Sequence, residues 1–185
     1  MREDYKEILH SHTDISTKRL LLRKFTLDDI QDIYTYASDE QTLKNLAWTG
    51  IKSLEEAKEL IDGYYSSDGI YAIALKDTGR CIGCISLNLI PEHEKADFGY
   101  VLNIKYWNQG YMTEALNSIM MFCFQKLELN RVEAIHYVGN ENSGKVMEKC
   151  GMRKEGYAIQ EVKIKGVFRD VVHYGITKEE WFNEL

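Results

Sequence analysis

The sequence contains a single proline and no long hydrophobic run, and both shortages limit what it can be. Pro91 is the one proline in 185 residues, and no low-complexity segment, linker or internal repeat interrupts the chain. No apolar stretch approaches the roughly 20 residues that a membrane-spanning helix needs. The charged start MREDYKEILHSHTD also lacks the apolar centre of a signal peptide. We therefore expect one cytoplasmic domain over residues 1–185, without a membrane partner.

Basic residues are too few to suggest a protein that binds nucleic acid. Lys and Arg number 23 against 29 Asp and Glu, which leaves a net charge of −6. Nucleic-acid binding usually needs a positively charged surface, so this class of function is disfavoured. A cationic partner such as an amine or a basic peptide is compatible with the charge balance. The chain also has no G-x-x-x-x-G-K-[ST] motif, which excludes a P-loop nucleotide hydrolase.

Cysteine is scarce, and its positions do not form a metal site. Cys81 and Cys84 make a C-x-x-C pair, a spacing that can serve metal or redox chemistry. The pair lies within RCIGCISLNLI, a strand-like run in which residues three apart point to opposite faces. No second pair of cysteines or histidines stands at zinc-ligand spacing. We therefore predict no metal and expect small buried apolar side chains at Cys81, Cys84, Cys123 and Cys150.

The most informative stretch runs from residue 96 to residue 127. Residues alternate in character over 96–102, as in a strand, and Gly99 within this strand indicates a bulge, which we favour, or a close approach to the backbone. A short turn containing Gly110 follows. Apolar residues then recur at helical spacing, at Met112, Ala115, Leu116, Ile119, Met120, Cys123 and Leu127. A glycine turn ahead of a helix can bind an anion such as phosphate, although an ordinary strand–turn–helix has the same pattern.

The remaining pattern predicts an α/β (α+β) fold built on a mixed, mostly antiparallel sheet. We expect strands at 19–25, 69–75, 81–90, 96–102, 131–138, 157–165 and 169–176. We expect helices at 42–48, 112–127 and 140–150, and further helices capped by Thr26, Ser53 and Thr177. The strand–helix–strand unit around 112–127 requires a parallel pair, whereas the hairpins are antiparallel. The sheet should have six to seven strands, helices on both faces, and a splay between 97–102 and 131–137.

Three blocks of the sequence resemble the Gcn5-related N-acetyltransferases, the GNAT superfamily. They read GYVLNIKYWNQGYMTEAL, LELNRVEAIHYVGNENSGKVMEKCGM and EGYAIQEVKIKGVFRDVVHYGI, in the order and spacing of that family. The similarity covers nearly the whole chain, from RLLLRKFTLDDI to RDVVHYGITKEEW. It is greatest to the branch that resembles the ribosomal-protein N-terminal acetyltransferases. The resemblance implies an enzyme that transfers acetyl from acetyl-CoA to an amine.

The resemblance also assigns positions that bind coenzyme A. The family's pyrophosphate turn, Gln/Arg-x-x-Gly-x-Gly/Ala, falls on residues 107–112, where Trp107 and Met112 depart from the pattern. The implied contacts are Tyr100, Val101 and Leu102 along pantetheine, Gln109, Gly110, Tyr111, Met112 and Thr113 around pyrophosphate, and Asn140 and Ser143 of NENS near pantetheine and sulfur. Backbone N–H groups can hold phosphate whatever the side chain at residue 112.

The implied reaction is direct attack of an amine on the acetyl thioester in a ternary complex. The amine must lose a proton, and the departing thiolate benefits from gaining one. Ser143 is the candidate proton donor, with Tyr137 as the alternative. Asp97 and Glu161 are the candidate bases, although each also fits a solvent-facing strand carboxylate, and a water relay needs neither. The strand histidines, His136 and His173, are expected to be packed or at the surface.

No motif identifies the acceptor. Its binding regions would be the helices of 26–66 and the hairpin of 157–170, which carry no readable pattern. The branch resemblance favours the N-terminal α-amine of a protein or peptide. A small amine, such as a polyamine, amino acid or aminoglycoside, is the alternative, and a non-catalytic acyl-CoA-binding sensor is a third interpretation. Exposed edge strands near the C-terminus could also pair two copies into a homodimer.

Overall fold

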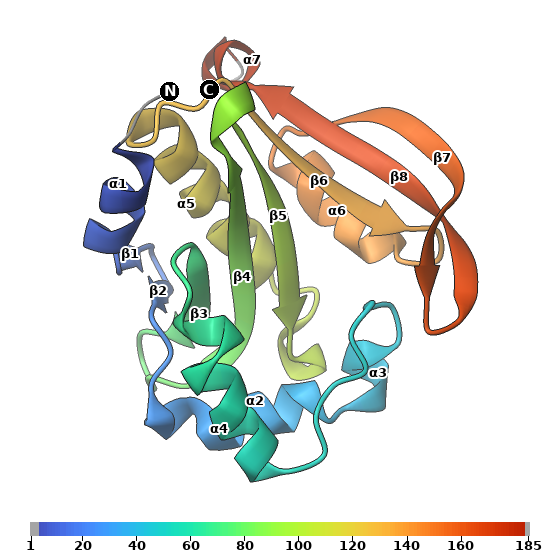
Figure 1. Cartoon of the computed structure of the whole chain (residues 1–185). Helices are drawn as coiled ribbons and strands as arrows, with labels where there is room; N and C mark the ends of the chain where they lie inside the picture. Colours follow the sequence, from blue (N-terminus) through green and yellow to red (C-terminus); the bar gives the residue numbers. More distant parts are fainter. Residues whose placement is uncertain (1–3, 184–185) are drawn as a thin grey trace.

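One eight-stranded sheet with helices on both faces forms the framework of the molecule (Figure 1). The computed structural model describes residues 4–183, and the outermost residues of the predicted domain, 1–3 and 184–185, lie outside this part. The strands are β1 (Ile15–Ser16), β2 (Leu20–Arg23), β3 (Ile70–Leu75), β4 (Cys81–Ile90), β5 (Lys95–Leu102), β6 (Arg131–Tyr137), β7 (Arg153–Ile164) and β8 (Val167–Thr177). The helices are α1 (Tyr5–Ser11), α2 (Ile30–Ala37), α3 (Glu40–Leu43), α4 (Leu54–Asp62), α5 (Tyr111–Gln125), α6 (Glu141–Lys149) and α7 (Lys178–Asn183). None of the helices in this part of the chain is long and apolar enough to cross a membrane.

The predicted class, a mixed and mostly antiparallel sheet, is confirmed with eight strands instead of six to seven. The strand order is β1-β2-β3-β4-β5-β6-β8-β7, and every neighbouring pair is antiparallel except β5 with β6. The additional strand is β1, which pairs with β2 over two residues. Two residues are too few to show an alternating pattern, so the sequence does not reveal this strand.

β5 and β6 run parallel but separate after a short ladder. Lys95–Phe98 of β5 pairs with Arg131–Ala134 of β6, and within these described strands the pairing stops there. β5 stays paired with β4 along its other edge as far as Leu102. The free edge of β5 after Phe98 therefore faces a gap between two halves of the sheet. This is the predicted splay.

Of the two interpretations of Gly99, the favoured bulge is wrong and the close approach is confirmed. The β4–β5 ladder runs without a register shift along the whole of β5. The glycine instead allows a close approach, because a Cβ at residue 99 would lie 2.9 Å from the Ser86 hydroxyl oxygen. That hydroxyl donates to the Gly99 carbonyl oxygen at 3.2 Å. A glycine within a strand marks either a bulge or a close approach, and here it marks the second.

A register shift does occur between β3 and β4. Gly83 and Cys81 face consecutive residues of β3, so Ile82 is an extra residue on β4. An extra residue reverses the alternation of side chains, and Cys81 and Cys84 both reach the core cluster beneath α2 and α4. The expectation that these two side chains point to opposite faces is therefore wrong. All four cysteines are buried and free, as predicted.

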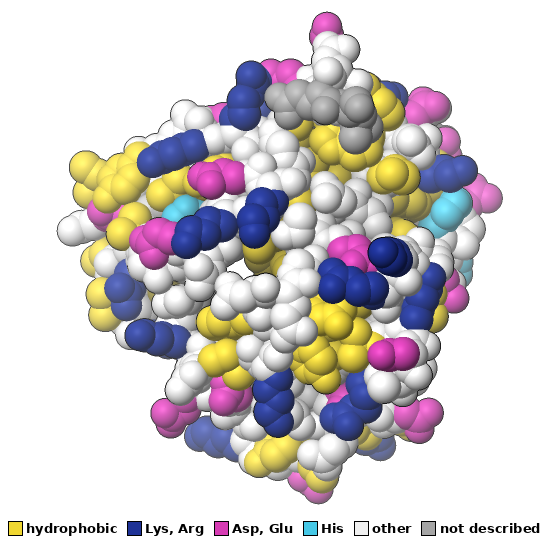
Figure 2. Space-filling view, turned by 180° about the vertical axis from the view of Figure 1, so that it is seen from behind, with side chains coloured by type: hydrophobic (Ala, Val, Ile, Leu, Met, Phe, Trp, Pro, Cys, Tyr) yellow, Lys and Arg dark blue, Asp and Glu magenta, His cyan; other side chains and the backbone are white. Residues whose placement is uncertain are grey.

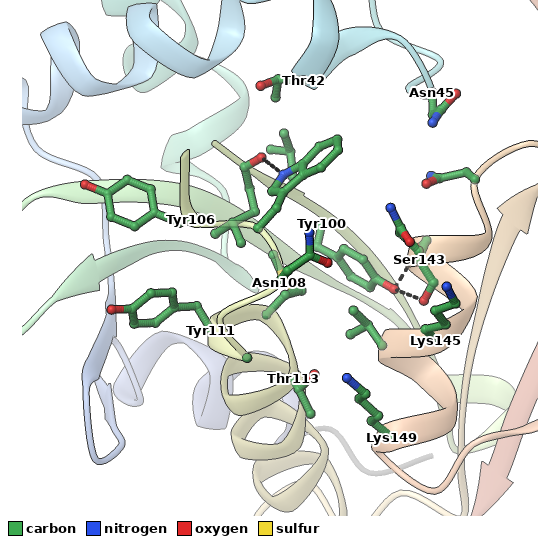
Figure 3. A pocket seen from close by; sticks show the side chains of 18 of the residues that line it. Thr42, Asn45, Tyr100, Tyr106, Asn108, Tyr111, Thr113, Ser143, Lys145 and Lys149 are labelled. Carbon is green, nitrogen blue, oxygen red and sulfur yellow. Dashed lines mark hydrogen bonds between the residues drawn. The ribbon is translucent and has the colours of Figure 1, made fainter. Parts of the chain in front are cut away.

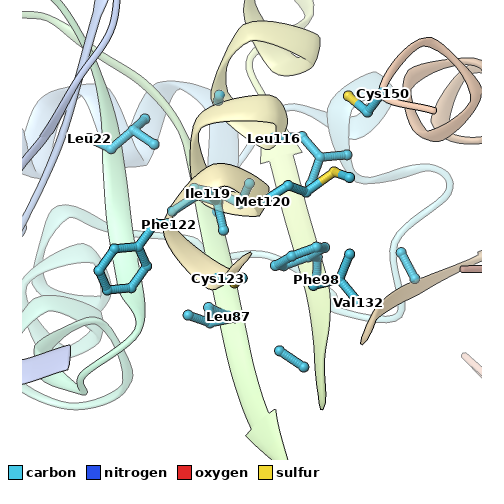
Figure 4. Packing of buried hydrophobic residues seen from close by; sticks show 14 of the residues in the cluster. Leu22, Leu87, Phe98, Leu116, Ile119, Met120, Phe122, Cys123, Val132 and Cys150 are labelled. Atoms are coloured by element: carbon cyan, nitrogen blue, oxygen red, sulfur yellow. The ribbon is translucent and has the colours of Figure 1, made fainter. Parts of the chain in front are cut away.

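α5 packs across one face of the sheet and forms the larger core (Figure 4). Leu116, Ile119 and Met120 are fully buried there, as their helical spacing predicts. Burial of each such side chain stabilises the fold by about 1.5–3 kcal/mol. The helix begins at Tyr111, directly after the glycine turn, and ends at Gln125. Packing of α5 therefore fixes the turn relative to β4 and β5.

α2 and α4 cover the opposite face and are fixed by polar contacts at their starts. Ser53 caps α4 as predicted, because its side chain accepts from the Glu56 N–H at 3.2 Å. Ahead of α2, the buried Asp29 carboxylate accepts from the Thr26 N–H at 2.8 Å. The same carboxylate accepts two hydrogen bonds from Arg23 of β2, at 2.7 and 2.8 Å. These hydrogen bonds connect the residue directly before α2 to strand β2 of the sheet.

The C-terminal hairpin is longer than predicted and reaches α3. β7 begins at Arg153 rather than at residue 157. The sequence does not reveal this earlier start, because the mostly exposed residues of β7 show little alternation. The helix predicted at 42–48 is shorter and ends at Leu43. In the turn between β7 and β8, Lys165 Nζ donates to the Leu43 carbonyl oxygen at 3.1 Å. The hairpin and α3 therefore meet beside the gap between β5 and β6 (Figure 1).

Candidate active site

The turn between β5 and α5 has a backbone that suits an anion. Asn108 and Gly110 have positive φ angles of 59° and 78°, and α5 starts at the next residue, Tyr111. The first N–H groups of a helix have no partner within it and carry partial positive charge. Left-handed residues in such a turn bring further N–H groups to one side. The turn therefore offers a set of backbone donors to a phosphate group.

A half-buried ion pair between Arg19 and Glu114 stabilises the start of α5, directly after this turn. Glu114, in the first turn of α5, accepts from Arg19 Nε at 2.6 Å, from the Arg19 N–H at 2.7 Å and from the Thr17 hydroxyl at 2.6 Å. Burial alone would raise the pKa of Glu114, but the hydrogen bonds from Thr17 and Arg19 outweigh it and lower the pKa. The segment that leads into β2 is thereby tied to the start of α5.

β5 supplies one wall of a cleft beside the turn. A Cβ built on Gly83 of β4 would lie 2.3 Å from the Val101 carbonyl oxygen, so this carbonyl points at β4. Backbone groups alternate in direction along a strand, and those of Tyr100 and Leu102 therefore face the gap. The Leu102 carbonyl oxygen already accepts from Trp107 Nε1 at 2.7 Å. Among residues 100–102, the backbone groups of Tyr100 and the N–H of Leu102 therefore remain available on the gap side.

α6 supplies the other wall and is bonded to β5 through Tyr100 (Figure 3). Ser143 Oγ donates to the Tyr100 phenol oxygen at 2.8 Å, and the phenol donates to the Ser143 carbonyl oxygen at 3.0 Å. Burial raises the pKa of Tyr100, so the phenol stays neutral and can make both bonds. Gly144 lets α6 lie close to β6, because a Cβ there would be 2.8 Å from His136 Nε2. This close packing places Ser143 opposite β5.

The cleft gathers most of the predicted coenzyme A positions. Its lining includes Tyr100, Val101, Leu102, Gly110, Tyr111, Met112, Thr113, Asn140 and Ser143. Gln109 is the exception, because its side chain is exposed and donates to the Lys105 carbonyl oxygen at 2.9 Å. Met112 is 6% exposed and packs mainly into the core, so its bulk is directed away from solvent.

The cleft also contains residues that the sequence reasoning missed. Lys145 and Lys149 stand one turn apart on α6, and Thr42 and Asn45 come from α3 and the loop after it (Figure 3). Figure 2 shows Lys and Arg side chains around the hollow on this side of the molecule. The i, i+4 spacing of the two lysines after NENS was an available signal. Thr42 and Asn45 reach the cleft only through tertiary packing, which no local pattern encodes.

Residues 19–153 match the family model described as the acetyltransferase (GNAT) domain. The chain belongs to the GNAT acetyltransferase family. It is an N-acetyltransferase, and acetyl-CoA is its co-substrate. The cleft of this GNAT enzyme fits coenzyme A by its own chemistry, since it combines helix N–H groups and two lysines for phosphates with a free β5 edge for amide groups. Within residues 4–183, no group of three or more His, Cys, Asp or Glu side chains is arranged to hold a metal ion.

Proteins similar to this GNAT chain have names that give different acceptors. The putative ribosomal N-acetyltransferase YdaF of Bacillus subtilis is 38% identical over 122 residues, which cover 65% of this chain and 66% of that protein. The structure of a GNAT-family acetyltransferase from Bacillus anthracis has a TM-score of 0.82 at 28% identity, with 90% of this chain and 99% of that chain covered. Spermidine N-acetyltransferase from Vibrio cholerae, solved with CoA and spermine, has a TM-score of 0.74 at 21% identity, with 90% and 100% covered. The last likeness concerns the fold alone.

The predicted base Asp97 lies on the face of the GNAT sheet opposite α5. Ala96 and Phe98 of β5 point into the core beneath α5, so Asp97 between them points the other way. Its carboxylate accepts from Asn88 Nδ2 at 2.7 Å. Asp97 does not line the cleft. The structure therefore separates this carboxylate from the coenzyme A positions. It leaves Asp97 half-buried on the open side of the sheet, which is the part of the α2 and α4 face that these helices do not cover.

The second predicted base, Glu161, lies next to His173 on the same open side. The β7–β8 register shifts beside Gln160, which has a left-handed φ of 50°. Asp170 of β8 stabilises this irregularity by accepting from the Gln160 N–H at 2.8 Å. His173 Nε2 and Glu161 Oε2 then lie 2.6 Å apart. His173 is at the surface as expected, and its pairing with Glu161 is a feature that the sequence did not suggest.

Proposed function

We propose that this acetyltransferase acts on the N-terminal α-amine of a protein or peptide. The observation that carries the proposal is the accessible sheet face beside the β5–β6 gap. There Ile135 is 41% exposed to solvent, and the side chains of Glu161 and His173 are 38% and 40% exposed. An extended peptide can reach such a face, and the name of the relative YdaF refers to a ribosomal acceptor. Carboxylates on this face would attract a cationic amine.

In the proposed arrangement, the two substrates approach the gap from different sides. Acetyl-CoA lies in the cleft between β5, the start of α5 and α6, and the amine arrives from the open face. A C–N bond forms between the amine nitrogen and the acetyl carbon, and the C–S bond breaks. The amine loses one proton to a base, and the thiolate gains one proton. Holding the two reactants together in this way can contribute roughly 7–11 kcal/mol to lowering the barrier.

Residues of the cleft would hold the cofactor in this proposal. N–H groups of the turn from Gln109 to Thr113 bind the pyrophosphate, and Lys145 and Lys149 add positive charge beside it. Backbone groups of Tyr100 contact pantetheine, because its edge of β5 is not paired with β6. Asn140, at the start of α6, lies on the opposite wall of the same passage.

Two side chains would transfer the protons, and a third would attract the acceptor. Ser143 lines the cleft, and its hydroxyl, which bonds to Tyr100 in the structure, turns its proton from the phenol to the departing sulfur as the C–S bond breaks. Glu161, held beside His173, accepts the proton of the amine. Asp97 lies on the same open face as Glu161 and favours the approach of the cationic acceptor. The free state of all four cysteines fits a reducing compartment, and we therefore propose that the reaction takes place in the cytoplasm.

The acceptor is tested by a mass-spectrometric screen with acetyl-CoA and two sets of acceptors. One set contains peptides with free N-termini, each matched to the same peptide with a blocked N-terminus and an internal lysine. The other set contains spermidine, free amino acids and aminoglycosides. The proposal requires acetylation of free N-termini and not of the blocked peptides. Acetylation confined to small amines would replace the proposed acceptor, and tight acetyl-CoA binding without any turnover would indicate a sensor.

A further inference from the structure

The peptide bond between Gln109 and Gly110 is held in one orientation by Arg19. Arg19 Nη1 donates to the Gln109 carbonyl oxygen at 2.9 Å. In a trans peptide, the carbonyl and the following N–H point in opposite directions. The Gly110 N–H is therefore directed away from Arg19. Gly110 lines the cleft whereas Arg19 does not.

A glycine at position 110 makes this restraint necessary. A peptide flip changes the φ angle of the residue that follows it, and glycine adopts positive and negative φ with similar ease. The observed φ of 78° at Gly110 is therefore one of two accessible states. In the other state, the Gln109 carbonyl would face the cleft and would repel a phosphate. An interaction from outside the turn is therefore needed to hold the peptide in the orientation in which the Gly110 N–H faces the cleft.

Arg19 is itself fixed firmly enough to make that selection. Its Nε donates to Glu114 Oε2 at 2.6 Å, and its backbone N–H donates to Glu114 Oε1 at 2.7 Å. Its guanidinium carbon lies 4.1 Å from the centre of the Tyr111 ring. The planar fork of arginine can hold a carboxylate and a carbonyl at once, which a lysine ammonium cannot reproduce with the same geometry.

We propose that Arg19 is a positioning residue for the phosphate-binding turn: it fixes the 109–110 peptide so that the Gly110 N–H faces the pyrophosphate of coenzyme A. The proposal rests on the proposed assignment of Gln109–Thr113 to the pyrophosphate. Arg19 acts through the peptide and needs no contact with the ligand. Its effect should therefore appear only with ligands that carry the pyrophosphate.

The experiment compares Arg19→Met and Arg19→Lys with the unmodified protein, using CoA and pantetheine in calorimetry. Loss of one oriented N–H and exposure of a carbonyl should weaken CoA binding about 10- to 100-fold in Arg19→Met. Pantetheine binding should not change. In kinetics, KM for acetyl-CoA should rise with little change in kcat, while kcat/KM for acetyl-pantetheine should remain constant. Arg19→Lys should show at least half of the loss on a logarithmic scale.

Lys24→Met is the matched control. Lys24 also bonds a backbone carbonyl, that of Ser67 at 2.8 Å, and an acidic side chain, that of Asp68 at 3.1 Å, but it lies outside the cleft lining. The CoA affinity of the Lys24→Met protein should equal that of the unmodified protein. Normal CoA binding by Arg19→Lys would overturn the proposal, because charge alone would then suffice. An equal loss for pantetheine would also overturn it. Calorimetry measures CoA binding even if no acceptor is acetylated, so failure of the proposed function is distinguished from failure of this proposal.

Discussion

Ser143 has a single hydroxyl proton, and in the structure that proton is directed to the Tyr100 phenol oxygen. The phenol is buried and neutral, and its own proton goes to the Ser143 carbonyl oxygen. The serine is therefore held in one rotamer on the wall of the cleft. Substitution at either residue will affect the other, because removing one partner of a buried hydrogen bond leaves the other unsatisfied.

Ser143→Ala should lower kcat about 100-fold, which is the lower range of general acid catalysis. Tyr100→Phe should lower kcat about 10-fold, because the Ser143 hydroxyl would remain but would lose the phenol that fixes its orientation. Steady-state kinetics with saturating acetyl-CoA measures both values. Ser118→Ala removes a hydroxyl that bonds to the Ala115 carbonyl on α5, outside the cleft, and should leave kcat unchanged. Equal activity of Ser143→Ala and Ser118→Ala would remove Ser143 from the mechanism.

Glu161→Gln should lower kcat/KM for the acceptor about 100-fold and abolish the fall in rate at acidic pH, because an amide cannot accept the proton. Asp97→Asn should raise KM for the acceptor but keep that acidic limb. A pH–rate profile of both variants and the unmodified enzyme separates the two roles. If the acidic limb is unchanged in both variants, neither carboxylate is the base, and a water relay becomes the better explanation.

At the scale of elements, the sequence predicts what depends on local pattern. The helical spacing that leads to Met120 locates α5, and the turn chemistry around Gly110 locates its start. The parallel pair implied by this helix also predicts the gap between β5 and β6. These features agree with the structure because each is encoded within a short stretch of chain.

The misplaced features depend on contacts between distant segments. The bulge expected at Gly99 lies at Ile82, because pairing with β3 decides which residue is extra. The sequence places Arg19 only at the start of a strand, since its role depends on Glu114 and Gln109, 95 and 90 residues away. Lys149 likewise enters the cleft through the packing of α6. A single sequence does not show which distant residues meet.

Glu114 connects the segment before β2 with α5, and its contribution should depend on pH. Because the pKa of Glu114 is lowered in the folded protein, its ion pair stabilises the fold above the unfolded pKa of about 4.3 and is lost as pH falls through the folded pKa. Urea unfolding should show Glu114→Gln to be less stable than the unmodified protein at pH 7, with the difference shrinking below about pH 4. A difference that stays constant across this pH range would contradict the assignment.

At the scale of the whole molecule, β7 is an outer strand of the sheet with exposed apolar side chains nearby. Ile159 of β7 is 76% exposed and Phe168 of β8 is 57% exposed. Such an edge can pair with another strand. We expect two copies to associate along β7, and sedimentation should give about twice the 21.5 kDa chain mass. Ile159→Lys should reduce this mass to the monomer, whereas Leu27→Lys, at an exposed site outside the sheet, should not.

The short β5–β6 ladder divides the sheet into two halves whose strands are paired over only a narrow width. Four residue pairs connect the β1–β5 half to the half formed by β6, β8 and β7. In the absence of ligand, amide hydrogen exchange should reveal the halves as two units that open separately. Acetyl-CoA bound between β5 and α6 would contact both halves of the molecule where their strands are not paired. Its binding should merge the slowly exchanging amides of both halves into one cooperative set.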